Sequence, residues 1–566
     1  MLKNNILILL LCFPLISHAQ YIYTRQDSLR GSLSPLRTCF DVVHEDLNLR
    51  VDVSKKSIAG HNKITYKVTQ PFTKLQLDLF ENLVIDSVVA NNQKLKFIRE
   101  GKAFFVEFAT LQALTNANST INSTNSLTVF YHGNPTIAAN PPWDGGFTFA
   151  KDLQNRDWVG VSCEGIGASI WYPNKDHLSD EPDSMRIYCE VPTGLTCVAN
   201  GNLISQRNTN DGFTGFEWKV SYPINNYNVT LNIANYAHIH DVYVSKNISK
   251  NISKNIGENS TKNDTLQLDY YILDYNKKKA EKHFQQVKTM LACFEKYFGK
   301  YPFWRDGYAL VETPYWGMEH QGAIAYGNNY KNLAEGFDFI IIHESGHEYF
   351  GNSLSVNDHA EMWIHESFTT YSEALYVEYT KNYNDAIAYL WKQRKNIANV
   401  TPMLGHFDVN YEGWVGSDIY YKGTWMLHSL RNTIDNDELW FATLKEYAEK
   451  FKISQVTTKQ TIEFFNAKTG KNLTSIFNQY LLYAKPPKLV YFMTYDKKTT
   501  TLHYRWEADE KEFSMPMKVK TSEFESKYQT IFPTKDFQTL ILKGQVENPQ
   551  FAEELFYFDL AKANKN

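Results

Sequence analysis

The sequence predicts a multidomain α+β protein in which a mainly helical domain stands between two β-rich domains. The chain has 566 residues, which is too long for one compact core and long enough for three or four domains. Apolar and polar residues alternate through the first half and again near the end, as in half-buried strands. Between these parts the apolar residues recur at helical spacing. We therefore expect folded domains over residues 20–244, 265–485 and 486–566.

The composition is that of a folded chain with no affinity for polyanions. The chain is 43% hydrophobic and 15% aromatic, so it can bury large cores. Its formal net charge of −4 leaves no basic field to attract nucleic acid or an anionic membrane, and we expect neither as a partner.

The first 19 residues have the pattern of a secretory signal peptide. Lys3 precedes an apolar run over residues 6–16, which is too short to span a bilayer, and a cleavage site follows at Ala19. We expect an exported protein, in the periplasm or outside the cell, with no transmembrane segment after the signal is removed. Cys12 could suggest a lipid anchor, but the bulky Leu11 before it argues against one, because lipoprotein signals carry a small residue there.

The cysteines that remain after signal removal are too few and too scattered for a disulfide scaffold. Cys189 and Cys197 could pair across a hairpin, or they could be two unpaired core residues. No Cys-x-x-Cys spacing occurs, which excludes a thiolate metal site.

The expected N-terminal domain consists of strands interrupted by turns. Residues 42–53 and 61–69 alternate apolar and polar side chains. Residues 115–126 form a polar low-complexity loop within this domain. Residues 245–264 repeat Lys-Asn-Ile-Ser and cannot bury a core, so we interpret them as a linker or an insertion near a domain boundary.

Helical periodicity begins after this segment. Residues 276–299 carry apolar side chains at helical spacing and end in a glycine. Further helices are expected at about 336–351, 362–382, 423–435, 437–452, 458–468 and 473–484. The Pro-Pro pair within residues 484–488 then ends the helical pattern, and the short strands that follow predict a small β-sandwich.

The stretch FIIIHESGHEYF contains the pattern H-E-x-x-H, formed by His343, Glu344 and His347. Residues four apart lie on one face of a helix, so both imidazoles can bind one metal ion, and Glu344 beside them can take a proton from a water. Chance would produce this pattern roughly 0.03 times in a chain of this composition, so coincidence is a poor explanation. The stretch also has the character of a buried helix, where polar side chains are costly unless they are paired or bind a metal.

A catalytic zinc ion usually takes three protein ligands and leaves a fourth position for water. Glu366 lies nineteen residues after His347, in a second helical stretch, WIHESFTTYSE. If that helix packs antiparallel against the first, Glu366 reaches the same metal. We therefore expect one Zn²⁺ per chain, although two histidines and a glutamate can also bind cobalt or manganese in vitro.

These two stretches resemble the signatures of the M1 family of zinc aminopeptidases, which includes aminopeptidase N and leukotriene A4 hydrolase. HESGHEYFGN is similar to the family's HExxHxWFGN, and WIHESFTTYSE is similar to its WLNEGFATY. The resemblance implies that His343, His347 and Glu366 bind zinc and that Glu344 is the catalytic base. His365 stands where the family usually has asparagine, and we interpret it as a neighbour of the site.

A second family signature, G-x-M-E-N, is matched by Gly317, Met318 and Glu319 in YWGMEHQGAIAYG. In the family this glutamate binds the free α-amine of the substrate. The role suits the chemistry, because an ammonium group needs a fixed carboxylate. The resemblance therefore places all three residues in the substrate-binding site. His320 replaces the usual asparagine there, and this departure could alter a contact with the substrate backbone.

Residues 161–183 resemble the segment of the N-terminal domain that reaches into the M1 active site. There a Gln-x-Glu or Gln-x-Gln pair helps to hold the substrate amine. Glu164 matches the second position and Ser162 departs from the first. A solvated loop acid is the alternative interpretation of Glu164.

The stretch DIYYKGTWML resembles the family's Y-x-K-G, whose tyrosine donates a hydrogen bond to the tetrahedral oxyanion. Since Lys422 and Gly423 follow, Tyr420 is the expected catalytic residue and Tyr421 a bystander, unless the register slips by one residue. A phenol directed at developing negative charge is a suitable oxyanion donor.

The resemblance covers about residues 40–485. It implies a saddle-like N-terminal β domain followed by a thermolysin-like, mainly helical catalytic domain. The large C-terminal helical domain of many members is missing, and the strand-like residues 486–566 replace it. We expect a site without that domain to be more open to longer peptides.

The sequence thus predicts an exported zinc aminopeptidase that acts on peptides with a free N-terminus. Three alternatives stay open. A thermolysin-type zinc endopeptidase shares the zinc pattern, although it has no amine for Glu319 to bind. An epoxide hydrolase occurs on the same scaffold within M1, but the missing helical domain argues against it. An inactive M1-like binding module is the third, and the intact ligands, base and tyrosine argue against that.

Overall fold

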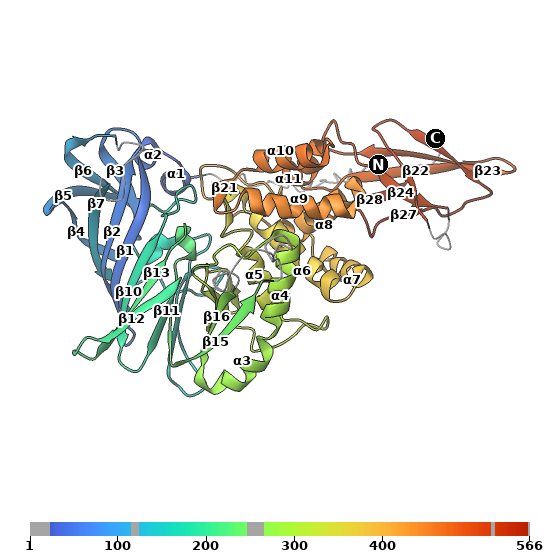
Figure 1. Cartoon of the computed structure of the whole chain (residues 1–566). Helices are drawn as coiled ribbons and strands as arrows, with labels where there is room; N and C mark the ends of the chain where they lie inside the picture. The colour runs from blue at the N-terminus through green and yellow to red at the C-terminus, as the bar shows by residue number, and fades with distance from the viewer. Residues whose placement is uncertain (1–22, 115–123, 246–264, 522–526, 564–566) are drawn as a thin grey trace, which may run out of the picture.

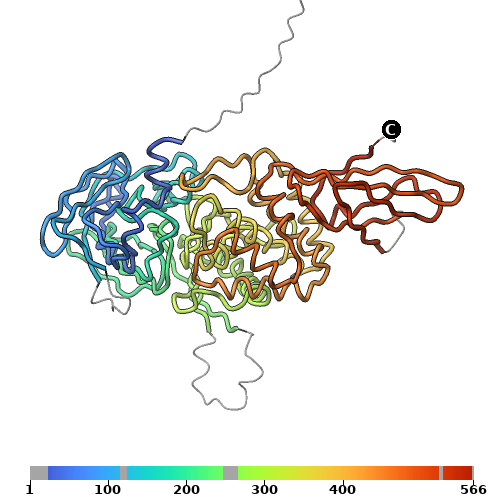
Figure 2. The backbone as a smooth tube through the Cα atoms, turned by 90° about the horizontal axis from the view of Figure 1, so that it is seen from above, coloured from blue at the N-terminus to red at the C-terminus, as the bar shows by residue number. Residues whose placement is uncertain are grey.

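The computed structural model describes residues 23–114, 124–245, 265–521 and 527–563. They form three blocks that follow one another along the molecule: a β-rich block, a helical block and a second β block (Figures 1 and 2). This confirms the predicted multidomain α+β class. The expected signal peptide with Cys12 and the greater part of both low-complexity segments lie outside the described residues and stay predictions.

The N-terminal block is built on a ten-stranded sheet with the strand order β12-β13-β10-β1-β2-β7-β4-β5-β6-β3. β1 pairs antiparallel with β2 and parallel with β10. Along β1, Leu47, Leu49 and Val51 are buried and the residues between them are more exposed, which confirms the predicted alternation. The strands are β1 (Phe40–Asp52), β2 (Ser57–Val68), β3 (Phe72–Asp78), β4 (Leu83–Ala90), β5 (Gln93–Glu100), β6 (Ala103–Gln112), β7 (Asn125–Gly133), β10 (Met185–Pro192), β12 (Asn202–Asn208) and β13 (Phe213–Val220).

A second sheet of this block has the order β11-β14-β9-β8 and adjoins the helical block. Its strands are β8 (Gly146–Lys151), β9 (Asp157–Ser162), β11 (Thr196–Ala199) and β14 (Leu231–Ala234). Two short helices, α1 (Arg25–Gly31) and α2 (Pro35–Thr38), precede the first strand. Cys189 and Cys197 lie in β10 and β11, and both are buried free thiols, as are the other described cysteines.

The helical block contains a five-stranded sheet with the order β15-β16-β17-β19-β18. β15 and β16, which flank residues 246–264 in the sequence, pair antiparallel over their whole length. The sheet therefore takes strands from both sides of the boundary that the sequence predicts. β18 lies at the edge of this sheet, so one side of its backbone is open to a further strand. The strands are β15 (Tyr236–Val244), β16 (Thr265–Leu273), β17 (Tyr308–Glu312), β18 (Gly317–Met318) and β19 (Ile324–Tyr326).

The helices of this block follow the predicted periodicity with three differences. The stretch 276–299 is two helices, because the chain turns at Phe284, whose ring is buried in the core. A helix not expected from the sequence, α7, follows α6, and α8 begins at Asp418, five residues before its predicted start. The helices are α3 (Lys277–His283), α4 (Gln286–Phe298), α5 (Phe339–His347), α6 (Trp363–Thr380), α7 (Tyr383–Arg394), α8 (Asp418–Ile434), α9 (Asp437–Lys450), α10 (Thr458–Thr469) and α11 (Thr474–Leu482). Two short strands, β20 (Leu354–Val356) and β21 (Ser454–Val456), pair parallel.

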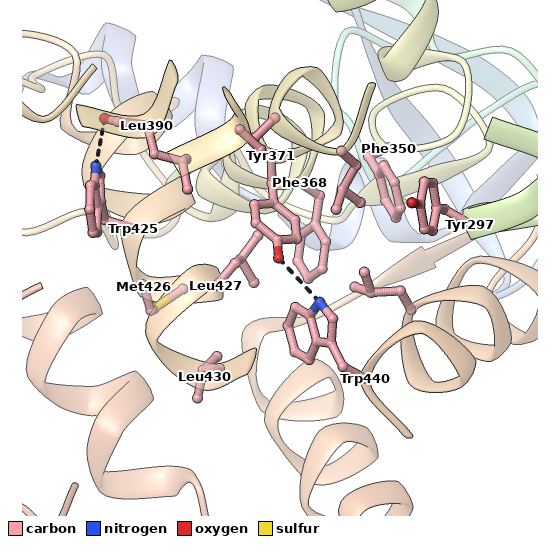
Figure 3. Packing of buried hydrophobic residues seen from close by; sticks show 14 of the residues in the cluster. Tyr297, Phe350, Phe368, Tyr371, Leu390, Trp425, Met426, Leu427, Leu430 and Trp440 are labelled. Atoms are coloured by element: carbon pink, nitrogen blue, oxygen red, sulfur yellow. Dashed lines mark hydrogen bonds between the residues drawn. The ribbon is translucent and has the colours of Figure 1, made fainter. Parts of the chain in front are cut away.

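Large aromatic side chains fix helices α6 and α8 in the core (Figure 3). The indole of Trp440 donates a hydrogen bond to Tyr371 on α6 at 3.2 Å, and the indole of Trp425 on α8 donates to the carbonyl oxygen of Leu390 at 3.0 Å. Both indoles are fully buried with their single donor satisfied, so each contributes its apolar area without an unpaired polar atom. These contacts hold α6 and α8, two of the helices that carry predicted site residues.

The C-terminal block consists of two small sheets with the orders β26-β23-β22-β28 and β25-β24-β27. The sheets meet through apolar side chains, for example Tyr491 and Phe551, whose ring centroids are 5.0 Å apart. Its core is continuous with that of the helical block. The strands are β22 (Lys488–Tyr495), β23 (Thr499–Glu507), β24 (Met517–Lys520), β25 (Gln529–Ile531), β26 (Gln538–Lys543), β27 (Gln550–Phe551) and β28 (Asp559–Lys562).

None of the helices in the described part of the chain combines the length and the apolar composition that crossing a membrane requires.

Arg394 of α7 joins the C-terminal block to the helical block. Its guanidinium donates to the carbonyl oxygens of Glu553 at 2.7 Å and Phe558 at 3.1 Å. We expect Arg394→Ala to lower the free energy of unfolding by about 2–3 kcal/mol, because charge-assisted bonds to two carbonyl groups are lost. Lys392→Ala on the same helix, which removes only an exposed ion pair with Glu335, should cost less than about 0.5 kcal/mol. Urea denaturation measures both, and equal losses would contradict this role of Arg394.

Candidate active site

Helices α5 and α6 bring the three predicted metal ligands together. His343 and His347 lie one turn apart on α5, and Glu366 lies in the first turn of α6, which packs against α5. The Nε2 atoms of the two histidines are 3.3 Å apart. Glu366 Oε2 lies 3.8 Å from Nε2 of His343 and 3.5 Å from Nε2 of His347. All three side chains are buried.

These donor atoms fit a tetrahedral zinc ion. Zinc bonds of about 2.0–2.2 Å at tetrahedral angles place neighbouring donors about 3.3 Å apart, close to the observed separations. His343 Nδ1 contacts Glu373 Oε1 at 2.7 Å, and His347 Nδ1 contacts the carbonyl oxygen of Phe350 at 3.0 Å. With the Nδ1 atoms directed at these acceptors, the Nε2 atoms converge on Glu366 Oε2, a buried atom without a hydrogen-bond partner. Three electron-pair donors that face one another favour a cation between them.

The two histidines differ in their electrostatics. Burial lowers the pKa of His343 to about 3, so this ring is neutral and able to bind a metal. Burial also opposes a charge on His347, but the carboxylates of Glu366 and Glu319 outweigh it and raise its pKa well above the usual value. The carboxylates therefore create a negative potential at the point where the donors converge.

Glu373 supports the ligand set and was missed in the sequence. Its carboxylate accepts the Nδ1 proton of His343 and also hydrogen bonds from Tyr389 Oη at 2.5 Å and Gln393 Nε2 at 3.0 Å. Burial raises its pKa to about 8. These contacts fix the ring orientation of His343. The available signal was spacing, because Glu373 follows Glu366 by two helical turns and so returns to the same face of α6.

Glu344 lies beside the ligands, in a space that a glycine leaves open. Burial, and then the charge of Glu319, raise its pKa well above the usual value. A Cβ atom at Gly317 would lie 2.5 Å from Glu344 Oε1, so a larger residue there would displace this carboxylate. Ligand atoms of Glu319, Glu344 and His347 also lie within 4.8 Å of one another. The predicted base and the predicted amine anchor are therefore neighbours.

Glu319 directly follows β18 and is held from two sides. Its Oε1 accepts a hydrogen bond from Tyr227 Oη at 3.1 Å, and its backbone oxygen accepts one from Asn352 Nδ2 at 2.8 Å. The residue is only 3% exposed, and burial raises its pKa. Met318, just before it, lines the same cavity. Tyr227 comes from the N-terminal block and carried no sequence signal, because nothing local relates it to Glu319.

The two histidines that depart from the family signatures are buried outside the cavity. Neither ring nitrogen of His320 or of His365 has a hydrogen-bond partner, and neither residue is among the described ones that line the cavity. Burial lowers the pKa of His320 to about 3 and that of His365 well below its usual value, so both are neutral. A contact between His320 and substrate stays a prediction. His365 approaches Gly351 next to His347, one of the predicted metal ligands, as expected for a neighbour of the site.

Glu164 reaches the cavity from the N-terminal block. It follows β9 in a turn that continues through Gly165, whose φ of +70° suits glycine. Burial, and then the charge of Glu319, raise the pKa of Glu164 well above its usual value, which differs from the environment of a solvated loop acid. Ser162 is buried and donates to the carbonyl oxygen of Pro142 at 3.4 Å instead of lining the cavity.

Tyr420 and Tyr421 both line the cavity, but their neighbours differ. The ring of Tyr420 stacks near that of His343, with centroids 6.2 Å apart and planes at 26°. Burial, and then Glu366, raise the pKa of Tyr420 well above its usual value. The pKa of Tyr421 is raised by burial and by Glu373, which is not one of the three predicted metal ligands. Tyr420 is thus the tyrosine on the side of the metal ligands.

The predicted site residues other than His320 line one cavity of about 380 Å³ between the N-terminal and the helical block. Its described lining contains no lysine, no arginine and no residue of the C-terminal block. The potential inside is therefore negative and favours cationic groups such as a metal ion and an ammonium group. Five glutamates line it: Glu164, Glu319, Glu344, Glu366 and Glu373.

We expect Glu373→Gln to weaken zinc binding by about 10- to 100-fold, because His343 loses the carboxylate that orients its ring and increases its basicity. Competition with a chromogenic chelator measures this affinity without reference to activity. Glu281→Gln, at an exposed position of α3, is the matched control. Equal zinc affinity in the two variants would contradict the assigned role of Glu373.

Known proteins share this fold and parts of this sequence. Mouse aminopeptidase B is 24% identical over 296 residues, which cover 49% of this chain and 41% of that protein. Leukotriene A-4 hydrolase from Xenopus laevis is 21% identical over 456 residues, 75% of this chain and 68% of that protein. The chain thus spans about two fifths of the length of aminopeptidase B.

Solved structures of M1 zinc metallopeptidases have the same fold. A variant of the enzyme from Deinococcus radiodurans, bound to a Tyr-Ser-Ala substrate, superposes with a TM-score of 0.62 at 18% identity, covering 78% of this chain and 94% of that one. A two-domain M1 zinc metallopeptidase variant bound to L-tryptophan gives a TM-score of 0.63, also at 18% identity, over 80% of this chain and 95% of that one. The chain therefore contains a region, residues 282–480 with the predicted metal ligands, that matches the peptidase family M1 domain.

Proposed function

We propose that this chain is an exported, zinc-dependent aminopeptidase that removes the first residue from peptides with a free N-terminus. The observation that carries the proposal is the placement of Glu319, a buried carboxylate fixed by Tyr227 and adjacent to Glu344 and His347. A fixed carboxylate at this place binds a substrate ammonium group, and its short distance from the reacting centre selects the first peptide bond.

The residues present fit the following division of roles. His343, His347 and Glu366 hold the zinc ion. When bound, zinc polarises the scissile carbonyl group and lowers the pKa of a water molecule. Glu344 accepts a proton from the water that attacks the carbonyl carbon, and it delivers this proton to the leaving nitrogen as the C–N bond breaks. Its raised pKa allows it to hold the proton between the two steps.

Two further groups act on the substrate. The phenol of Tyr420 stays protonated, because burial and the carboxylates raise its pKa, and it donates a hydrogen bond to the oxyanion that forms at the carbonyl. Glu164 joins Glu319 in binding the α-ammonium group. Gly317 and Met318 form the edge strand β18, so the backbone of an extended peptide can lie along it, and His320 is assigned no direct contact.

The proposed location and substrates rest on the sequence and on the cavity. The signal-peptide pattern of residues 1–19 supports export to the periplasm or the medium. No described residue of the C-terminal block lines the cavity, which supports the expectation that longer peptides are accepted.

The amine anchor is tested with L-leucine 4-nitroanilide and its N-acetylated form. We expect hydrolysis of the free-amine substrate alone, and a loss in kcat/KM of at least about 30-fold in Glu319→Gln, because the substrate ammonium group loses its buried partner. Glu438→Gln, on the exposed first turn of α9, should behave as wild type.

Comparable cleavage of the acetylated substrate would contradict the proposal and indicate an endopeptidase-like site. Absence of activity on both substrates by zinc-loaded protein would indicate a binding module instead.

The oxyanion donor is tested by a pair of adjacent substitutions on α8. We expect Tyr420→Phe to lower kcat by about 10²- to 10³-fold with little change in KM, because the lost hydrogen bond forms only in the transition state. Tyr421→Phe should cause a much smaller loss. Steady-state kinetics of both variants on L-leucine 4-nitroanilide measures the two losses. A larger loss of kcat in Tyr421→Phe than in Tyr420→Phe would assign the oxyanion hydrogen bond to Tyr421.

A further inference from the structure

Two exposed tryptophans stand at the mouth of the cavity. The chain has 12 tryptophans, all within the described residues, and only Trp143 and Trp316 are exposed by more than a third of their surface, at 66% and 45%. Both line the active-site cavity. Large aromatic side chains are ordinarily buried, so two that are exposed side by side at a cavity mouth indicate a contact surface for a ligand.

The two indoles come from different blocks and lie next to each other. Trp143 lies between β7 and β8 of the N-terminal block, and Trp316 directly precedes β18. Their ring centroids are 6.5 Å apart and their planes are tilted by 40°. This separation is too small for a third ring to enter between them as in a sandwich. A side chain can instead pack across the two faces, which form a shallow V.

The aromatic surface continues inward to a metal ligand. Trp316 stacks on Phe339, with centroids 5.4 Å apart and planes at 20°. Phe339 in turn stacks on His343, with centroids 5.1 Å apart and planes at 19°. The stacked side chains of Trp316, Phe339 and His343 therefore connect the mouth of the cavity to the predicted metal ligands. A side chain bound at the mouth would belong to a peptide that extends to these ligands.

The indole of Trp316 and the loop that carries Trp143 are both held in place. The indole Nε1 of Trp316 donates a hydrogen bond to Asn328 Oδ1 at 3.2 Å. The loop of Trp143 is tied by Asp144, whose Oδ2 accepts hydrogen bonds from the backbone N–H groups of Ala139 and Asn140, both at 2.7 Å. Little conformational entropy therefore remains to be lost when a ligand packs on them.

The position along β18 shows which part of a peptide reaches this surface. Glu319, the proposed amine anchor, and Trp316 are three residues apart, which corresponds to roughly 10 Å along an extended strand. An extended peptide whose amine contacts Glu319 and whose backbone follows β18 has its second and third residues at this distance. The tryptophans therefore lie on the leaving side of the scissile bond, beyond the first residue.

We propose that Trp143 and Trp316 form a subsite for a large apolar or aromatic side chain at the second or third residue of the peptide. The proposal rests on the aminopeptidase function proposed above and adds to it a preference on the leaving side. The physical basis is burial of apolar area against two preorganised indole faces, with an added contribution from aromatic pairing.

The test uses the peptides Leu-Xaa-Gly-NH₂ and Leu-Gly-Xaa-NH₂, with Xaa either tryptophan or alanine. The C-terminal amides avoid placing a free carboxylate in a cavity lined by glutamates. We expect kcat/KM to be at least about tenfold higher for tryptophan than for alanine in one of the two series. Trp143→Ala and Trp316→Ala should each reduce this ratio by about threefold or more, whereas the corresponding phenylalanine variants should keep most of it. Phe532→Ala, at a 69% exposed position of the C-terminal block, is the control and should leave the ratio unchanged.

Hydrolysis of leucinamide by the wild type separates the two proposals, because this substrate has no second side chain. If leucinamide is cleaved and the ratio is close to one in both series, the subsite is refuted and the aminopeptidase stands. The subsite is equally refuted if the ratio persists in both alanine variants, or if only the preference for the first residue changes. If the wild type cleaves neither leucinamide nor the peptides, the proposed function itself fails.

Discussion

The accumulation of negative charge in one cavity is the constraint on which the rest of the structure depends. Five glutamates line the cavity, and its described lining contains neither lysine nor arginine. Burying a carboxylate costs several kcal/mol unless a positive charge or several hydrogen bonds compensate it. The pKa values of Glu164, Glu319 and Glu344 are accordingly all raised, in each case by burial first. A zinc ion and the ammonium group of a peptide are the two cations whose binding would relieve this cost.

Hydrogen bonds between the N-terminal and the helical block hold the segment of Glu319 in position. Asn228 of the N-terminal block donates to Asn352 Oδ1 at 2.7 Å and accepts from the N–H of Gln321 at 3.0 Å, while Asn352 holds the backbone of Glu319. The segment after β18 is thus fixed to both blocks, and the N-terminal block contributes to the lining of the cavity. The C-terminal block lies away from the cavity and contributes differently, because its core is continuous with that of α8, the helix that carries Tyr420.

Site residues that are close together in the sequence were predicted more easily than residues that are far apart in it. His343 and His347 lie four residues apart, so their spacing alone predicted a shared face with Glu344 beside it. The prediction that Glu366 joins them needed one further assumption, that the two neighbouring helices pack against each other. The structure shows that they do.

Other parts could not be read from local pattern. Tyr227 and Trp143 reach the site through the pairing of the two blocks, which no local pattern encodes. The early start of α8 was missed because Asp418, its first residue, does not act as a helix cap but accepts hydrogen bonds from the backbone N–H groups of Ala398 and Asn399.

Anomalous diffraction at the zinc absorption edge, from crystals of the Glu344→Gln variant with a bound peptide, tests the central claim most directly. The account predicts one zinc peak within bonding distance of His343, His347 and Glu366, and the peptide's amine against Glu319. A peak instead at the neighbouring group of Glu319, residue 344 and His347, or a peptide bound with its amine away from Glu319, would contradict it.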